Sequence, residues 1–235
     1  MAPYTGEFLN GKKHGRGKVV YADNSWYDGY FKFDLYDGEG ELHDPTGLYH
    51  GAFSKGLRWG EGMFMNLEGV VYEGGWREGR RHGVGKLRHL DGSVYHGAWA
   101  HDKPEGKGRF KEVGGVEYEG GYVNGLREGR ASWKVREMKY EGGFAHGEMR
   151  GVGSFTWEDG GRFTGRWREG GEGGGEMPKE MEEIKSRSNE QPAKTKIPVD
   201  FRPGEVSKFV KNFRDTCATP PPRRHDEDVD EGEGG

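Results

Sequence analysis

Residues 72–92 have the sequence YEGGWREGRRHGVGKLRHLDG, and the same pattern restarts at Tyr95 and again at Tyr118. The shared skeleton is Y-x-G-x-aromatic-x-x-G-x-x-x-G-x-G-x-apolar, with 22 or 23 residues from one start to the next. Eight copies begin, in chain order, at Tyr4, Tyr27, Tyr49, Tyr72, Tyr95, Tyr118, Tyr140 and Phe163. A fixed spacing of this kind predicts a repeat architecture in which every copy forms one structural unit.

Each copy predicts a β-hairpin. With the tyrosine counted as position 1, positions 1, 3 and 5 share one face of a strand, because side chains alternate with period two. Position 8 is Gly in six copies and Asp in the other two, Asp34 and Asp102, which suits a turn with positive φ. The return strand carries Gly, Gly and an apolar residue at positions 12, 14 and 16. We expect these glycines to leave space for neighbouring rings, because Gly in a strand often marks a close approach.

Stacked hairpins bury a continuous face that a single hairpin lacks. The sequence therefore predicts an all-β fold over residues 1–170: an elongated, twisted antiparallel sheet of stacked hairpins with an aromatic groove on one side. The eighth copy is degenerate, since Pro178 takes its apolar position, and only its first strand at 163–167 is expected. The second return-strand glycine is replaced by Ala131 in the sixth copy and by Glu176 in the eighth.

The composition changes after residue 170. We expect a polar linker over 171–202, an amphipathic helix over 203–215, and a disordered Pro-rich and acidic tail over 216–235. The apolar face of the expected helix has the spacing i, i+3, i+4, i+7 and consists of Val206, Phe209, Val210 and Phe213. Two interpretations stay open: the helix folds back onto the repeats, or it docks into a partner.

Charge and cysteine usage exclude several classes of protein. The net charge is −4, and the first 170 residues carry equal numbers of acidic and basic side chains, which argues against nucleic-acid binding. The single cysteine, Cys217, allows no disulfide within the chain and fits a reducing compartment. No signal-peptide pattern and no run of 18 apolar residues occurs, so we expect a cytoplasmic protein without a membrane span.

Catalytic and metal-binding motifs are not found. The sequence contains no C-x-x-C, H-E-x-x-H or G-x-S-x-G, and its histidines recur because the repeat recurs. Residues 6–13 (GEFLNGKK) approach a Walker A loop but end in Lys rather than Ser or Thr. We therefore predict that the chain is not an enzyme and has no cofactor or metal.

The skeleton resembles the MORN repeat (membrane occupation and recognition nexus) from residue 4 to about residue 170. Compact MORN proteins with a short charged tail are similar to the MORN subunits of the radial spoke head in motile cilia and flagella. The resemblance implies a structural scaffold of the cytoskeleton, located in the axoneme, with other protein subunits as partners. An alternative is an adaptor that binds phosphoinositides at a membrane surface, although the neutral repeat region lacks the usual polybasic cluster.

The most regular part of the groove supplies the candidate protein-binding residues. They are Tyr72, Trp76, Tyr95, Trp99, Tyr118 and Tyr122. The competing interpretation is that these rings pack only on one another and on the glycines. The two open sheet edges predict a homodimer or pairing with another MORN protein, since unpaired edges invite further strands.

Overall fold

The computed structural model of the chain describes residues 3–167. These residues form one sheet of fifteen strands and contain no helix. The linker at 171–202, the helix with Val206, Phe209, Val210 and Phe213, and the tail at 216–235 lie outside the described residues.

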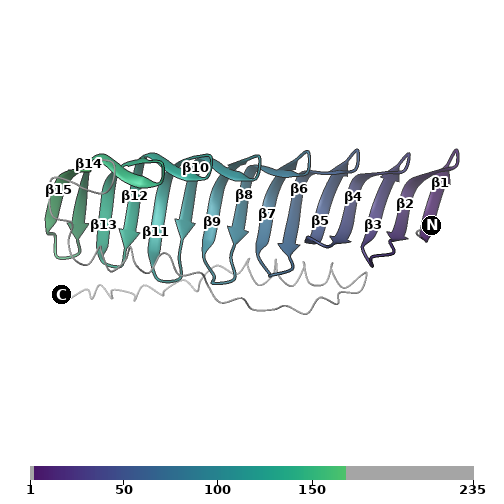
Figure 1. Ribbon diagram of the computed structural model, residues 1–235, viewed down its shortest axis with the longest axis horizontal. Helices are drawn as coiled ribbons and strands as arrows, with labels where there is room; N and C mark the ends of the chain where they lie inside the picture. Colours follow the sequence, from purple (N-terminus) through teal and green to yellow (C-terminus); the bar gives the residue numbers. More distant parts are fainter. Residues whose placement is uncertain (1–2, 168–235) are drawn as a thin grey trace, which may run out of the picture. The chain divides into compact units, whose positions relative to one another are not determined.

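The order of the strands in the sheet is their order in the sequence, and each strand is antiparallel to the next (Figure 1). The strands are β1 (Tyr4–Leu9), β2 (Lys12–Val20), β3 (Trp26–Lys32), β4 (Leu35–Asp44), β5 (Gly47–Ser54), β6 (Leu57–Asn66), β7 (Val71–Arg77), β8 (Arg80–Arg88), β9 (Val94–Ala100), β10 (Lys103–Lys111), β11 (Val116–Val123), β12 (Leu126–Val135), β13 (Met138–Ala145), β14 (Glu148–Trp157) and β15 (Arg162–Trp167). The predicted fold class is confirmed: each of the first seven repeats is one hairpin, and β15 is the first strand of the eighth.

The turn inside each hairpin has two residues. In the fourth repeat these are Glu78 and Gly79, with φ of 52° and 79°, and in the fifth they are His101 and Asp102, with 50° and 69°. Positive φ at both central residues is the type I′ geometry, whose twist matches that of the flanking strands. The sequence predicted positive φ at position 8, and the structure shows that the residue at position 7 has positive φ as well.

The glycines at positions 3 and 14 make room for the tyrosine of their own repeat. In the fourth repeat Gly74 and Gly85 are paired across β7 and β8, and a Cβ on either would collide with atoms that include the Tyr72 hydroxyl. The tyrosine lies across both glycines, and its hydroxyl donates a hydrogen bond to the carbonyl of Gly75 at 2.9 Å. The same bond from position 1 to position 4 is made by Tyr4, Tyr27, Tyr49, Tyr72, Tyr95, Tyr118 and Tyr140.

The glycine at position 12 has a different role from the one that the sequence predicted. No atom lies within 4 Å of a Cβ built on Gly83, so no ring occupies that space, whereas its φ is 78°. Gly74 faces Gly85 but Trp76 faces Arg81, so three residues of β8 stand opposite one residue of β7. Gly83 is the middle residue of this bulge, and glycine is needed there because L-residues rarely adopt a left-handed backbone.

The core is a row of rings. Tyr72 packs edge-to-face on Trp76 of its own repeat and on Trp99 of the next, with centroids 5.3 Å apart in both pairs. Equivalent contacts continue without a break from Phe8 to Trp167. Edge-to-face pairs add stabilisation beyond the area that they bury. Each tyrosine therefore joins its repeat to the following one.

Candidate functional site

The six predicted groove residues are all buried, with at most 7% of any side chain exposed. Neighbouring rings cover their edges. The side chain at position 10, the second residue after the turn, covers a further face of four of them: Tyr72, Trp76, Trp99 and Tyr118.

Position 10 differs from repeat to repeat. Its occupants are Lys13, Tyr36, Arg58, Arg81, Pro104, Arg127 and Met149. In the fourth repeat the guanidinium of Arg81 lies 5.6 Å from the ring centre of Tyr72 and 4.4 Å from that of Trp99. Arg58 covers the corresponding pair one repeat earlier, at 5.1 Å from Tyr49 and 5.3 Å from Trp76. These distances are those of cation–π contacts.

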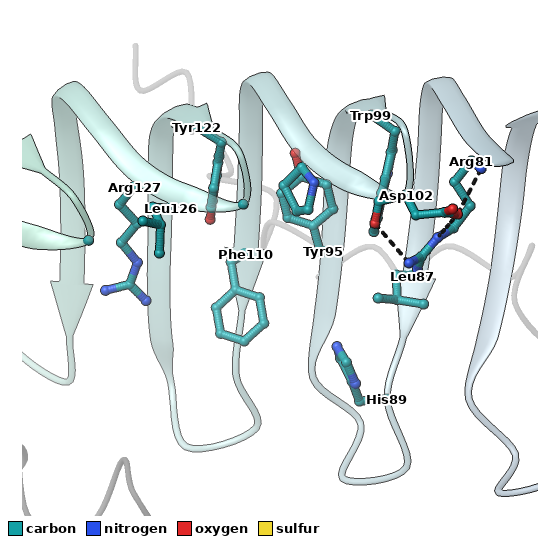
Figure 2. A pocket seen from close by; sticks show the side chains of 13 residues that line it. Arg81, Leu87, His89, Tyr95, Trp99, Asp102, Phe110, Tyr122, Leu126 and Arg127 are labelled. Atoms are coloured by element: carbon teal, nitrogen blue, oxygen red, sulfur yellow. Dashed lines mark hydrogen bonds and ion pairs between the residues drawn. The ribbon is translucent and has the colours of Figure 1, made fainter.

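The fifth repeat breaks this series, because its position 10 is Pro104. Proline has no long side chain to extend over Tyr95 and Tyr122, the pair that this position would cover. A pocket of about 420 Å³ lies there instead, lined by Tyr95, Trp99 and Tyr122 (Figure 2). The structure thus brings three of the six predicted residues to one pocket.

The other three predicted residues do not line the pocket. Tyr72 and Trp76 lie beneath Arg81 and Arg58, and Tyr118 lies beneath Arg127, whose guanidinium is 4.8 Å from its ring centre. The role of all six in binding stays a prediction.

The walls of the pocket are apolar. Leu87 and Phe110 stand at position 16 of the fourth and fifth repeats, and Leu126, at position 9 of the sixth, is 48% exposed. Figure 2 shows these side chains on three different strands around the rings. The pocket therefore combines buried rings with apolar walls that solvent reaches.

Charged side chains stand at both ends of the pocket. Arg81 and Arg127 line it from β8 and β12, and Asp102 is the acidic side chain among its described lining residues. Arg81 donates from Nε to the Asp102 carboxylate at 3.2 Å and from Nη2 to the Asp102 carbonyl at 2.9 Å. Two bonds to one residue hold this guanidinium in a fixed orientation.

The phenols of the pocket are neutral at ordinary pH. Burial raises the pKa of Tyr95 and of Tyr122 above the usual value, in Tyr122 against the opposing effect of Arg127. The hydroxyl of Tyr95 donates to the carbonyl of Ala98 at 2.9 Å. Neutral, hydrogen-bonded phenols suit the site for binding a side chain rather than for acid–base chemistry.

The sequence prediction did not include position 10 among the binding residues, although the repeats show a pattern at this position. At this fixed position the third, fourth and sixth repeats have Arg58, Arg81 and Arg127, whereas the fifth has Pro104. The meaning of this pattern depends on the rings of two successive repeats, which only the packing shows. Within residues 3–167, no cluster of three or more His, Cys, Asp or Glu side chains could hold a metal ion. The same part of the chain has no helix long and apolar enough to cross a bilayer.

Comparison with known proteins adds three findings. The family model for the MORN repeat matches seven segments of the chain: residues 4–26, 27–48, 49–65, 72–94, 95–111, 118–132 and 140–162. A stretch of 76 residues is 36% identical to alsin of Mus musculus, Pan troglodytes and Homo sapiens, and covers 30% of this chain. The match spans only 5% of the length of alsin.

A solved structure is also similar, at a level that carries no argument. It is the TCP domain of SAS-4 (dCPAP) in complex with a proline-rich motif of Ana2 (dSTIL) of Drosophila melanogaster. The TM-score is 0.30 and the identity 11%, over 67% of this chain and 87% of that one.

The family is established by the repeats themselves. The matched segments cover more than half of the chain, and the structure folds each of them as a hairpin of one sheet. MORN repeats form a non-enzymatic repeat family. The chain belongs to the MORN-repeat family.

Proposed function

We propose that this chain is a non-enzymatic scaffold that assembles proteins by binding partner segments on the aromatic face of its sheet. The observation that supports the proposal is the pocket at Pro104, where position 10 places no long side chain over the rings of Tyr95 and Tyr122 within the described residues 3–167. Its volume of about 420 Å³ falls within the range of roughly 300–1,000 Å³ that is usual for binding pockets. Aromatic and arginine side chains are also those that contribute most to binding at protein interfaces.

A finer proposal concerns the assembly itself. The resemblance of the repeats to the MORN subunits of the radial spoke head favours a place in the axoneme of motile cilia or flagella. A sheet held together by one unbroken row of ring contacts suits a structural subunit, because each repeat is fixed to the next. Pairing of the sheet with a second copy or with another MORN protein is part of the same proposal.

The test uses a variant in which only the pocket is altered. Pro104→Arg introduces the residue that three other repeats carry at this position, so the fold is expected to be retained. Proximity labelling in ciliated cells should identify a set of proteins around the wild type, and part of that set should be lost around Pro104→Arg.

Two outcomes distinguish the proposed scaffold function from the proposed place in the radial spoke head. Identical labelled sets for the wild type and the variant would contradict partner binding at the pocket. A labelled set without axonemal proteins would contradict the radial spoke proposal and leave the scaffold function in place.

A further inference from the structure

The charges around the pocket indicate which kind of partner segment it can bind. Arg81 on β8 and Arg127 on β12 stand on opposite sides of the rings, and Asp102 is already bonded to Arg81. The pocket thus offers apolar surface at its centre and cationic groups at its ends. The complement of this pattern is an apolar side chain between two anionic groups.

We propose that the pocket binds a partner protein segment in which an aromatic side chain is flanked on both sides by carboxylates. The ring enters the pocket against Tyr95, Trp99 and Tyr122, one carboxylate lies at Arg81, and the other lies at Arg127. This inference rests on the proposed scaffold function and names the partner's chemistry.

The arginines favour carboxylates over neutral groups. A guanidinium has five N–H donors in a fixed fork that matches a carboxylate. The two bonds from Arg81 side-chain nitrogens to Asp102 use two of those donors. Since Asp102 fixes the orientation of Arg81, binding requires little further ordering of this side chain.

The central side chain should be aromatic because of what lines the pocket. Tyr95 already contacts Trp99 and Tyr122 edge-to-face, and position 10 of its own repeat, Pro104, places no cation over Tyr95 and Tyr122. A further ring can make the same kind of contact, and it buries more apolar area than an aliphatic side chain does. Leu87 and Phe110 complete an apolar surround.

The sheet sets the spacing of the carboxylates. β8 and β12 are four strand intervals apart, which is about 19 Å at about 4.8 Å per interval. An extended peptide that crosses the strands advances about 3.3 Å per residue, so it spans this distance with about six residues. The carboxylates should therefore stand two or three residues before and after the aromatic residue.

One segment of this chain has a related pattern. Residues 226–231 have the sequence DEDVDE, with Val229 among acidic residues. Valine fills less of a pocket of this size than an aromatic ring and buries less apolar area. A partner segment with an aromatic residue is therefore the better occupant, and binding of residues 226–231 is an alternative outcome of the test.

The experiment measures fluorescence anisotropy with the full chain. The probe is a fluorescein-labelled peptide with a central phenylalanine, a serine on each side, and an aspartate and a glutamate beyond each serine. Two matched peptides replace the phenylalanine by alanine or the four acidic residues by lysine. We expect the first peptide to bind at least tenfold more tightly than either of the others.

Variants of the chain locate the binding. Pro104→Arg should abolish binding by filling the pocket. Arg127→Met should weaken binding about tenfold while keeping a cover over Tyr118, because Met149 occupies the same position in the seventh repeat. Lys13→Met makes the same change of charge far from the pocket and should leave the affinity unchanged. Thermal melting checks that each variant is folded.

Each alternative predicts a different result in these binding measurements. Equal binding of the three peptides, or full binding by Pro104→Arg, would contradict the inference. A tenfold gain in affinity when the acidic residues of 226–231 are changed to Asn and Gln would assign the pocket to this chain's own segment instead. Binding to phosphatidylserine vesicles that Pro104→Arg abolishes would assign it to a membrane surface. If the peptides fail but Pro104→Arg still loses partners in proximity labelling, only the partner's chemistry is wrong and the scaffold function stands.

Discussion

The ring of Tyr72 lies across Gly85 on the neighbouring strand, so closely that a Cβ at Gly85 would collide with the phenol. This relationship recurs in the first, second, third, fifth and seventh repeats, where the glycine at position 14 lies under the tyrosine of its own hairpin. The fold therefore depends on the absence of side chains at chosen places as much as on the rings that fill them.

Two glycines on β8 should respond in opposite ways to substitution. Gly83 needs its positive φ but faces open space, whereas Gly85 has no positive φ but lies under a ring. Gly83→Asn should be milder than Gly83→Ala, because Asn tolerates the left-handed region, and Ala there costs about 1–2 kcal/mol. At Gly85 the order should reverse, since Asn is larger, with Ala costing about 1–3 kcal/mol.

Urea unfolding of the four variants measures these orders. Ala131 shows that the sixth repeat accommodates one methyl group at position 14, which sets the lower end of the range at Gly85. The same order of Ala and Asn at both sites would contradict the two separate roles.

Removing the hydroxyl of Tyr72 should destabilise the sheet. Tyr72→Phe keeps the ring but leaves the buried carbonyl of Gly75 without its donor at 2.9 Å, which should cost about 1–3 kcal/mol. Tyr4→Phe is the matched control, because its bond to the Glu7 carbonyl is exposed and water can replace it. Chemical denaturation compares the two, and equal losses would show that the bond contributes nothing beyond the ring.

Filling the pocket should leave stability nearly unchanged. Pro104→Arg gains cation–π contacts worth about 0.5–1 kcal/mol and loses the restriction that proline places on the unfolded chain, worth about 0.4–1 kcal/mol. The amide of Gly125 should keep its bond to the carbonyl of residue 104, which is 2.9 Å long in the wild type. A crystal structure should show the new guanidinium within about 6 Å of the ring centres of Tyr95 and Tyr122. A loss above about 2 kcal/mol would instead mean that the hairpin requires proline there.

The buried tyrosines predict a sharp alkaline unfolding. Burial raises the pKa of Tyr118 and of Tyr140 from 10.0 to about 12, so their neutral form is the one that the fold accommodates. Their contribution to stability is complete below pH 10. Between pH 10 and 12 the unfolded chain loses these protons and the folded chain keeps them, so each group costs the fold about 1.4 kcal/mol per pH unit.

Absorbance of tyrosinate near 295 nm and circular dichroism should therefore change together above pH 10. The chain in concentrated urea should titrate near pH 10 without a cooperative step. Ionisation of the tyrosines near pH 10 with the sheet intact would contradict their burial.

Much of the architecture could be predicted from sequence because it depends on local rules. The period of Tyr, Gly and aromatic residues specifies hairpins with a ring face, and Gly79 or Asp102 at position 8 specifies the turn. The role of Gly83 was predicted incorrectly, since a glycine that admits a ring and a glycine that admits a left-handed backbone look the same in a sequence. Only the pairing of Gly74 with Gly85 and of Trp76 with Arg81 reveals the bulge between them.

The sequence by itself determined the repeat, the all-β sheet and the row of rings, because side-chain alternation and glycine spacing act within one hairpin. The tertiary structure alone decided where that row is open. The pocket requires Arg81, Pro104 and Arg127 from three successive repeats to stand over the rings of their neighbours. The amides at the hairpin turns set this alignment by donating to the carbonyls of the preceding repeat, as Asp102 does to Arg81 at 3.2 Å and Gly125 to Pro104 at 2.9 Å. Such contacts join residues about twenty positions apart, and no local pattern encodes the direction in which one hairpin lies over the next.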